Sequence, residues 1–327
     1  MTSSWFHEPR GEATHSVACI LKWLALLPRT LRLRNVRLEI LSPDGSSTAS
    51  LHYVCETESL DYLKDLLQCR ELETETFPVW RCGDKIQSLQ SRGVIVVMEI
   101  NRLLRCLVPP GSLITFPWIR HKVHLKEQTY RERRGKIEAT FGRKVRQNQF
   151  QFRTTQNLNA LRQFYDDFYA PYIEFRFGSL THLRSLAELR TAVQHGFLLQ
   201  VFDGDLWISG AVCAMKGRTL TMTAIGLLPD YQEQLRRGAM SAAYYFMFQW
   251  AEANGIETLD LLRTRPHRQE GSFEHKRKWG GLPMVDLWPH TSLHFFVPAN
   301  TPIPPPLQQL LIWTGENFEE LQNLRCP

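Results

Sequence analysis

The chain has 327 residues, of which 43% are hydrophobic and 22% charged, and its formal net charge is +6. Its 19 Gly and 18 Pro residues are close to average usage, which excludes a fibrous or wholly disordered protein. No two of its 7 Cys residues have the CxxC spacing of a zinc or redox site, so we expect reduced thiols, no metal site and a cytoplasmic location.

Residues 1–30 are predicted to form an N-terminal helical segment. The apolar stretch from Val17 to Leu27 is interrupted by Lys22 and covers about 11 residues, whereas a membrane-spanning helix needs about 20. We therefore expect no stable membrane insertion. An interfacial helix in peripheral contact with a membrane is the alternative, because several arginines follow this stretch.

Residues 31–127 are predicted to form a small α/β unit. Runs of β-branched residues between turn residues predict its strands, and Pro109-Pro110-Gly111 marks a break in the chain after them. The expected elements are strands at 36–41, 49–55, 77–82 and 94–100, and a helix at 60–72.

Residues 128–300 are predicted to form the main domain, and residues 301–327 a proline-rich linker with a C-terminal helix at 307–324. The main domain should begin with a basic helical stretch and a strand, followed by two helices capped by Asn157 and Ser185. The remaining elements are expected as strands at 197–202, 206–215, 219–228, 256–262, 283–288 and 293–297, and helices at 237–252 and 272–279. This order predicts an α/β fold in which a mixed sheet has helices on both faces.

The late segment Leu259–Gly281 reads LDLLRTRPHRQEGSFEHKRKWGG. It resembles the late motif of FemAB-like, peptidoglycan-bridge-transferase-related proteins, a branch of the GNAT acyltransferase superfamily. The matching residues are Asp260, Arg263, Gly271, Lys276, Trp279 and Gly280. The order of elements is also similar to the GNAT fold, and residues 31–127 could be a degenerate second GNAT domain. The resemblance implies an N- or O-acyltransferase.

Three residues depart from this motif. Leu262 stands where the family usually has glycine, Thr264 replaces serine, and His275 replaces phenylalanine beside the lysine.

Lys276 and Asp260 are the candidate catalytic residues that the resemblance implies. Lys276 would lie beside the acyl carbonyl, where an ammonium stabilises the developing oxyanion; the alternative is a solvated lysine in a basic run. Asp260 lies in an apolar strand, where a carboxylate is costly unless it is paired. It is either a general base or substrate anchor, or a structural partner of a basic side chain.

Five further residues are candidates for substrate binding. Arg263 and Arg265 could hold a phosphate or carboxylate by bidentate hydrogen bonds. Arg176, Tyr169 and Tyr172 could line an acceptor groove, although aromatic residues on such a helix are more often part of a core.

Arg237, Gly238 and Ala239 are the candidate binding site for the co-substrate. At the start of a long helix, their backbone N–H groups and the helix dipole would attract the pyrophosphate of CoA. The alternative is that Asp230 and Glu233 cap an earlier helix start, which would bury Gly238 within the helix.

Charge is concentrated between Arg102 and Arg153, where 13 Lys or Arg residues face 3 Asp or Glu residues. Such a stretch attracts the phosphates of a nucleotide, an RNA or a lipid headgroup. The alternative is a solvated helix face.

Three functions are consistent with these features. The first is an acyltransferase that moves an acyl group from acyl-CoA, acetyl-CoA by preference, to an amine or hydroxyl of a small molecule or polymer by direct attack. It would hold no permanently bound cofactor. The second is a FemAB-type transferase that uses aminoacyl-tRNA. The third is a non-catalytic GNAT-like module that binds an anionic polymer or a membrane surface.

Overall fold

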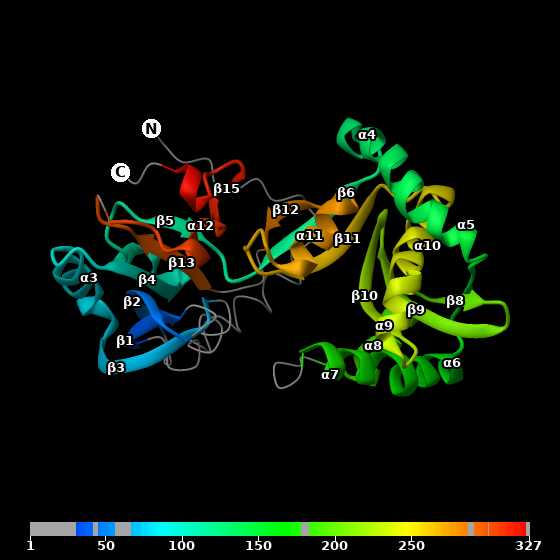
Figure 1. Ribbon diagram of the computed structural model, residues 1–327, viewed down its shortest axis with the longest axis horizontal. Coiled ribbons are helices and arrows are strands. Elements are labelled where there is room, and N and C mark those ends of the chain that lie inside the picture. The colour runs from blue at the N-terminus through cyan, green and yellow to red at the C-terminus, as the bar shows by residue number, and fades with distance from the viewer. Residues whose placement is uncertain are drawn as a thin grey trace. The chain divides into compact units, whose positions relative to one another are not determined.

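The computed structural model describes residues 31–41, 45–55, 67–177, 183–286, 291–299 and 301–324. They form two compact units, each built around its own sheet (Figure 1). The first unit comprises the described residues within 1–119, 265–270 and 285–327, and the second comprises those within 120–264 and 271–284. The predicted mixed α/β fold is confirmed. The helical segment predicted at 1–30 lies outside the described residues.

The first unit has an eight-stranded sheet with the order β15-β14-β5-β13-β4-β2-β1-β3. Strand β1 pairs antiparallel with both β2 and β3, whereas β2 and β4 are parallel. The bounds are β1 Arg32–Leu41, β2 Ser47–Cys55, β3 Cys69–Pro78, β4 Ile95–Asn101, β5 Leu113–Thr115, β13 Thr291–Phe296, β14 Leu311–Trp313 and β15 Phe318–Glu320.

Apolar side chains alternate between the two faces of this sheet. Val36, Leu38 and Ile40 of β1 belong to the core on one face, which the segment after β13 covers with α12 (Pro305–Gln308) and η6 (Leu321–Asn323). On the other face, α3 (Cys82–Gln90) packs Ile86 and Leu89 against the sheet. The short helices η1 (Val79–Arg81) and η2 (Arg102–Leu107) lead into α3 and out of β4.

The predictions for residues 69–82 were wrong. Cys69–Leu72, expected at the end of a helix, begin strand β3, and the strand expected at 77–82 is replaced by the end of β3, η1 and the first residue of α3. Strand β3 carries three Glu and one Arg, which favour helices, but it is the edge of the sheet, where charged side chains stay in solvent. Ion pairs such as Arg34–Glu71 at 3.2 Å link β3 to β1.

The C-terminal helix predicted at 307–324 was also wrong. Helix α12 ends at Gln308, and the chain then makes the hairpin of β14 and β15 around Gly315, whose φ is 106°, before the short helix η6. Trp313 of β14 also pairs with Ile114 of β5, and the apolar residues Leu310, Leu311 and Ile312 are buried in extended chain instead of on a helix face. The predicted strand at 293–297 is found as β13 in this same sheet.

The second unit has a seven-stranded sheet with the order β12-β6-β11-β10-β9-β8-β7. Strands β7 to β10 are antiparallel neighbours, and β10 pairs parallel with β11. The bounds are β6 Ile119–His124, β7 Gln151–Thr155, β8 Gly196–Asp203, β9 Leu206–Lys216, β10 Thr219–Leu227, β11 Thr258–Thr264 and β12 Leu282–Val285.

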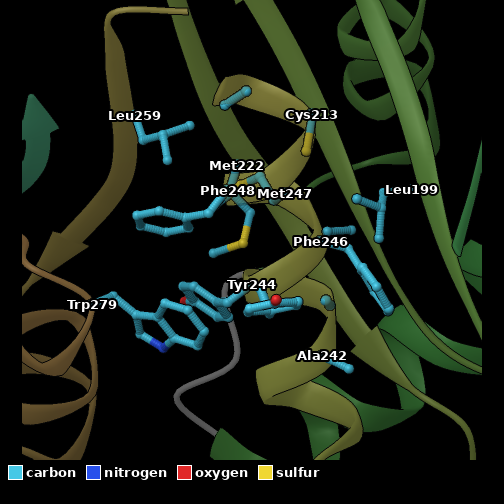
Figure 2. Close-up of a cluster of buried hydrophobic side chains, with 14 of the residues drawn as sticks. Leu199, Cys213, Met222, Ala242, Tyr244, Phe246, Met247, Phe248, Leu259 and Trp279 are labelled. Carbon is cyan, nitrogen blue, oxygen red and sulfur yellow. The ribbon is translucent and has the colours of Figure 1, made fainter. Parts of the chain in front are cut away.

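Helices cover both faces of this sheet. Helix α10 packs on one face, with Phe246 toward Leu199 and Phe248 toward Leu259 (Figure 2). A second core on the opposite face is formed with the helices between β7 and β8. The helix bounds are α4 Gln128–Ile137, η3 Glu138–Gly142, α5 Arg143–Gln147, α6 Leu158–Gln163, η4 Phe164–Tyr169, α7 Ala170–Phe177, α8 Leu186–Gln194, α9 Tyr231–Arg237, α10 Ala239–Ala253 and α11 Gly271–Lys278.

The helix starts predicted from Asn157 and Ser185 are confirmed. The Asn157 side chain accepts hydrogen bonds from the backbone N–H groups of Asn159 and Ala160, and Ser185 forms a capping box with Glu188. Within the described ranges, no helix combines the length and the apolar character needed to cross a membrane.

Candidate active site

Strands β10 and β11 separate after a short ladder. Their parallel pairing covers Thr219 to Thr221 on β10 and Thr258 to Asp260 on β11, although β10 continues to Leu227 and β11 to Thr264. Directly after the ladder, the register between β10 and β9 shifts between Met222 and Ala224. Such a bulge bends its strand and changes where its backbone groups point.

A left-handed residue accompanies this separation on β11. Leu262, at the position where the motif usually has glycine, has a φ of 63°, a conformation that costs a non-glycine residue about 1 kcal/mol or more. The Asp260 carboxylate holds this bend, since its Oδ1 accepts the N–H of Leu262 at 2.9 Å. Its Oδ2 accepts the Arg120 Nε–H at 2.6 Å from β6. Both carboxylate oxygens are therefore engaged, which favours the structural role for Asp260.

Lys276 lies at the end of β11. Its side chain is buried, with 7% exposed, and its Nζ donates to the Arg263 carbonyl at 2.7 Å. An ammonium in such a dry position acts through a lower effective dielectric than one in water. The alternative of a solvated surface lysine therefore does not fit the structure, whereas the neighbouring Lys278 is exposed.

His121 of β6 adjoins Lys276 and was not among the predicted site residues. It is fully buried, and its Nε2 lies 2.8 Å from Thr264 Oγ1. Burial, together with the positive charge of Lys276, lowers the pKa of His121 to about 3, so the ring is neutral near pH 7. A Cβ on Gly281 would lie 2.9 Å from the Lys276 carbonyl and 3.2 Å from His121 Cβ, so only glycine lets the chain after α11 pack here.

A second group of polar side chains gathers around α7, α10 and α11. Arg176 Nη1 donates to the Tyr172 hydroxyl at 2.9 Å, and the Tyr244 ring stacks on Trp279 at 5.4 Å (Figure 2). The His275 ring meets Tyr244 edge-on at 4.7 Å. The structure thus brings the predicted residues Arg176 and Tyr172 together with Tyr244 and His275, which were not predicted as site residues.

The remaining predicted substrate residues make other contacts. The ring of Tyr169 is buried in the core on the other sheet face, and its hydroxyl accepts the Arg184 N–H at 3.1 Å. Arg265 belongs to the first unit, where its N–H donates to Glu270 Oε2 at 3.1 Å. Arg263 contributes its backbone carbonyl to Lys276.

The predicted co-substrate residues lie between two helices. Gly238, with a φ of 92°, ends α9 and precedes α10, so the helix neither starts at Arg237 nor runs unbroken from Asp230. The Arg237 guanidinium donates to Asp203 Oδ2 at 2.6 Å. Because Arg237 already pairs with a carboxylate and Gly238 is buried, phosphate binding here stays a prediction.

Residues 128–147 of the basic stretch form the α4–α5 surface. Some of its charges are neutralised, for example by the Arg134–Glu252 ion pair at 2.6 Å. Others are exposed and pair with no acidic side chain in the described ranges: Arg131, Lys136, Arg143 and Lys144. Among the residues that the structure describes, no group of three or more His, Cys, Asp or Glu side chains could hold a metal ion.

Sequence patterns carried little signal for the unpredicted residues. His121 occupies a buried position in the alternating strand IRHKVH, which could have marked it as a polar residue facing inward. Tyr244 lies on a helix that is apolar around most of its circumference, so nothing in the pattern separates it from its core neighbours.

Similar proteins are found among solved structures. No family model matches the chain, and no curated protein matches it. The chain is similar to L-PGS from Bacillus licheniformis, with 12% identity over 91% of this chain and 96% of that chain and a TM-score of 0.37. FemX matches with 12% identity over 80% of this chain and 88% of that chain, at a TM-score of 0.39. A GCN5-related N-acetyltransferase from Sphaerobacter thermophilus matches with 12% identity over 82% of each chain, at a TM-score of 0.36.

These three matches extend over 80% or more of this chain and of each matched chain.

Proposed function

We propose that the second unit transfers an acyl group from an activated donor to an amine or hydroxyl acceptor. The observation that carries this proposal is the separation of β10 and β11 beyond Asp260, with the buried Lys276 ammonium at the end of β11. Strand edges that are not paired with each other offer N–H and C=O groups to an extended ligand. The amide-containing pantetheine arm of acyl-CoA is such a ligand.

The reaction would be direct attack. The acceptor nitrogen or oxygen forms a bond to the acyl carbon, the bond from that carbon to the thioester sulfur breaks, and the acceptor loses a proton as the thiolate leaves. Lys276 would stabilise the negative charge on the carbonyl oxygen. Asp260 is not assigned the role of base, because both of its oxygens already accept hydrogen bonds.

Aminoacyl-tRNA is the second candidate donor. The exposed basic side chains of the α4–α5 surface favour it, because RNA binding relies on contacts to phosphates. This alternative predicts binding of charged tRNA that weakens steeply with salt, whereas CoA binding should resist moderate salt.

A thermal-shift titration of the full chain with acetyl-CoA and with a long-chain acyl-CoA tests the donor. At a ligand concentration of about 100 times Kd, binding adds about 2.7 kcal/mol, or about 5 to 11 °C in Tm. If neither ligand raises the Tm, the acyl-CoA proposal is contradicted and aminoacyl-tRNA becomes the donor to test.

The variant Lys276→Met tests the chemistry, with Lys278→Met as the matched control on the same helix. We expect Lys276→Met to bind acyl-CoA but to lower acceptor-dependent CoA release by about 100-fold or more. Equal release by both variants contradicts the role of Lys276. Binding without any release by the native chain supports the non-catalytic module instead.

A further inference from the structure

Three buried or half-buried side chains around Arg176 hold hydrogen-bond donors that no described residue accepts. The first is Tyr172 of α7, whose ring is 1% exposed. Its oxygen accepts a hydrogen bond from Arg176, and a guanidinium can only donate. The Tyr172 hydroxyl can therefore still donate its own proton, and no residue among those described accepts it.

The second donor is the Tyr244 hydroxyl of α10. The side chain is 4% exposed, and the ring is fixed by stacking on Trp279 and by edge-on contact with His275. In the part of the chain that the structure describes, this hydroxyl makes no hydrogen bond. The hydroxyl oxygen is not among the described polar atoms that are shut off from solvent without a partner, so a ligand can reach it and accept its proton.

The third donor is His275 of α11. The Trp279 Nε1–H donates to His275 Nε2 at 3.2 Å, so Nε2 is the acceptor nitrogen and the proton of the neutral ring is on Nδ1. Burial, followed by the charge of Arg176, lowers the pKa of His275 to about 4, which keeps the ring neutral near pH 7. Nδ1–H is thus available as a donor.

The charges that act on these rings are positive. Besides burial, the charges of Arg176, Lys276 and Lys278 lower the pKa of His275. Burial raises the pKa of Tyr244, and the charge of Arg176 acts in the opposite direction. A guanidinium beside neutral hydrogen-bond donors is complementary to an anion.

We propose that Arg176, Tyr172, Tyr244 and His275 form a binding site for an anionic group, a carboxylate or a phosphate, carried by a substrate. Core packing alone does not account for the arrangement, because a phenylalanine at position 244 would fill the same space without a buried hydroxyl. The site rests on its own contacts and not on the proposed transfer reaction, so anion binding can be measured without any acyl donor.

The test is a thermal-shift titration of the full chain with inorganic phosphate and, separately, with acetate, at constant ionic strength. We expect a saturable rise in Tm with one of the two anions, and the anion that acts identifies the chemical source. Arg176→Gln should weaken this binding by about tenfold or more, and Tyr244→Phe by about threefold to tenfold. The control Arg190→Gln removes an exposed arginine on α8 and should leave binding unchanged.

Tyr244→Phe also separates a ligand site from a structural hydroxyl. Because it removes a hydroxyl that no described residue pairs with and keeps the ring, the Tm without anion should stay the same or rise while anion binding weakens. A fall in Tm without anion, no saturable shift with either anion, or equal weakening by Arg190→Gln overturns the proposal.

Discussion

The substitution Asp260→Asn distinguishes the two roles expected for this carboxylate. Asparagine keeps an oxygen that can accept the Leu262 N–H but removes the negative charge that faces Arg120. If Asp260 is a structural partner, the main effect is on stability. If it is a general base, the main effect is on turnover.

The magnitude follows from the burial of the pair. The Asp260 side chain is 6% exposed and that of Arg120 is 29% exposed, with Nε and Oδ2 2.6 Å apart. Removing one partner of a buried ion pair costs about 3–5 kcal/mol, and because Arg120 keeps some contact with solvent we expect about 2–4 kcal/mol here. Asp260→Ala also loses the hydrogen bond to the Leu262 N–H, which adds about 1 kcal/mol.

Urea unfolding followed by tryptophan fluorescence measures these changes. In a double-mutant cycle with Arg120→Met, we expect a coupling free energy of about 1–3 kcal/mol. The control is Asp166→Asn, in the exposed pair with Arg162 at 3.7 Å, which should cost less than about 0.5 kcal/mol. Additive effects of the two substitutions, or an Asp260→Asn variant as stable as the native chain, refute the structural role.

Three further outcomes follow from the same structure. Folding lowers the pKa of His275 from 6.5 to about 4, so the unfolded chain binds more protons than the folded chain between these pH values. The contribution of the neutral His275 to stability is therefore complete above pH 6.5 and is lost as the pH falls toward 4. The lost stability amounts to at most about 1.4 kcal/mol per pH unit, and His275→Gln should flatten the slope in urea unfolding measured from pH 4 to 7. A Cβ on Gly226 would lie 2.7 Å from the Phe168 backbone, so Gly226→Ala should destabilise the protein by about 1–3 kcal/mol. In α4, a Cβ on Gly135 would meet open space, so Gly135→Ala should stabilise it by about 0.5–1 kcal/mol. Equal effects of the two substitutions would contradict this reasoning. Leu262→Gly relieves the strain of the left-handed conformation but also removes a half-buried side chain, so it should change the free energy of unfolding by less than about 1 kcal/mol. The control Leu261→Gly, at a buried position, should cost about 3–5 kcal/mol. A large loss at Leu262 in the same unfolding assay would show that its side chain outweighs the strain.

Most of the second unit was predictable because its signals are local. Asn157 and Ser185 cap helices through backbone groups within three residues of themselves. The strands β8, β9 and β10 alternate or run apolar between short turns, so their neighbours in sequence are also their neighbours in the sheet.

The errors fell where a distant partner decides the conformation. Strand β3 carries helix-favouring residues and is a strand because β1 offers it an edge, and the Leu310–Trp313 run extends because β5 and β15 pair with it. No local propensity contains this information, since the pairing partners come from other parts of the chain.

The sequence by itself determined the alternation of strands and helices, the helix caps and the motif that singled out Lys276 and Asp260. Only the tertiary structure decided what these side chains do. Arg120, which lies 140 residues away from Asp260 along the chain, occupies its carboxylate, and His121 and Thr264 enclose the end of β11 beside Lys276. Tyr172, Tyr244 and His275 lie on three helices separated in sequence, and only their packing around Arg176 leaves hydroxyl and ring donors without acceptors among the described residues. Burial and hydrogen-bond satisfaction depend on which distant segments meet, and a linear pattern records only which residues are apolar.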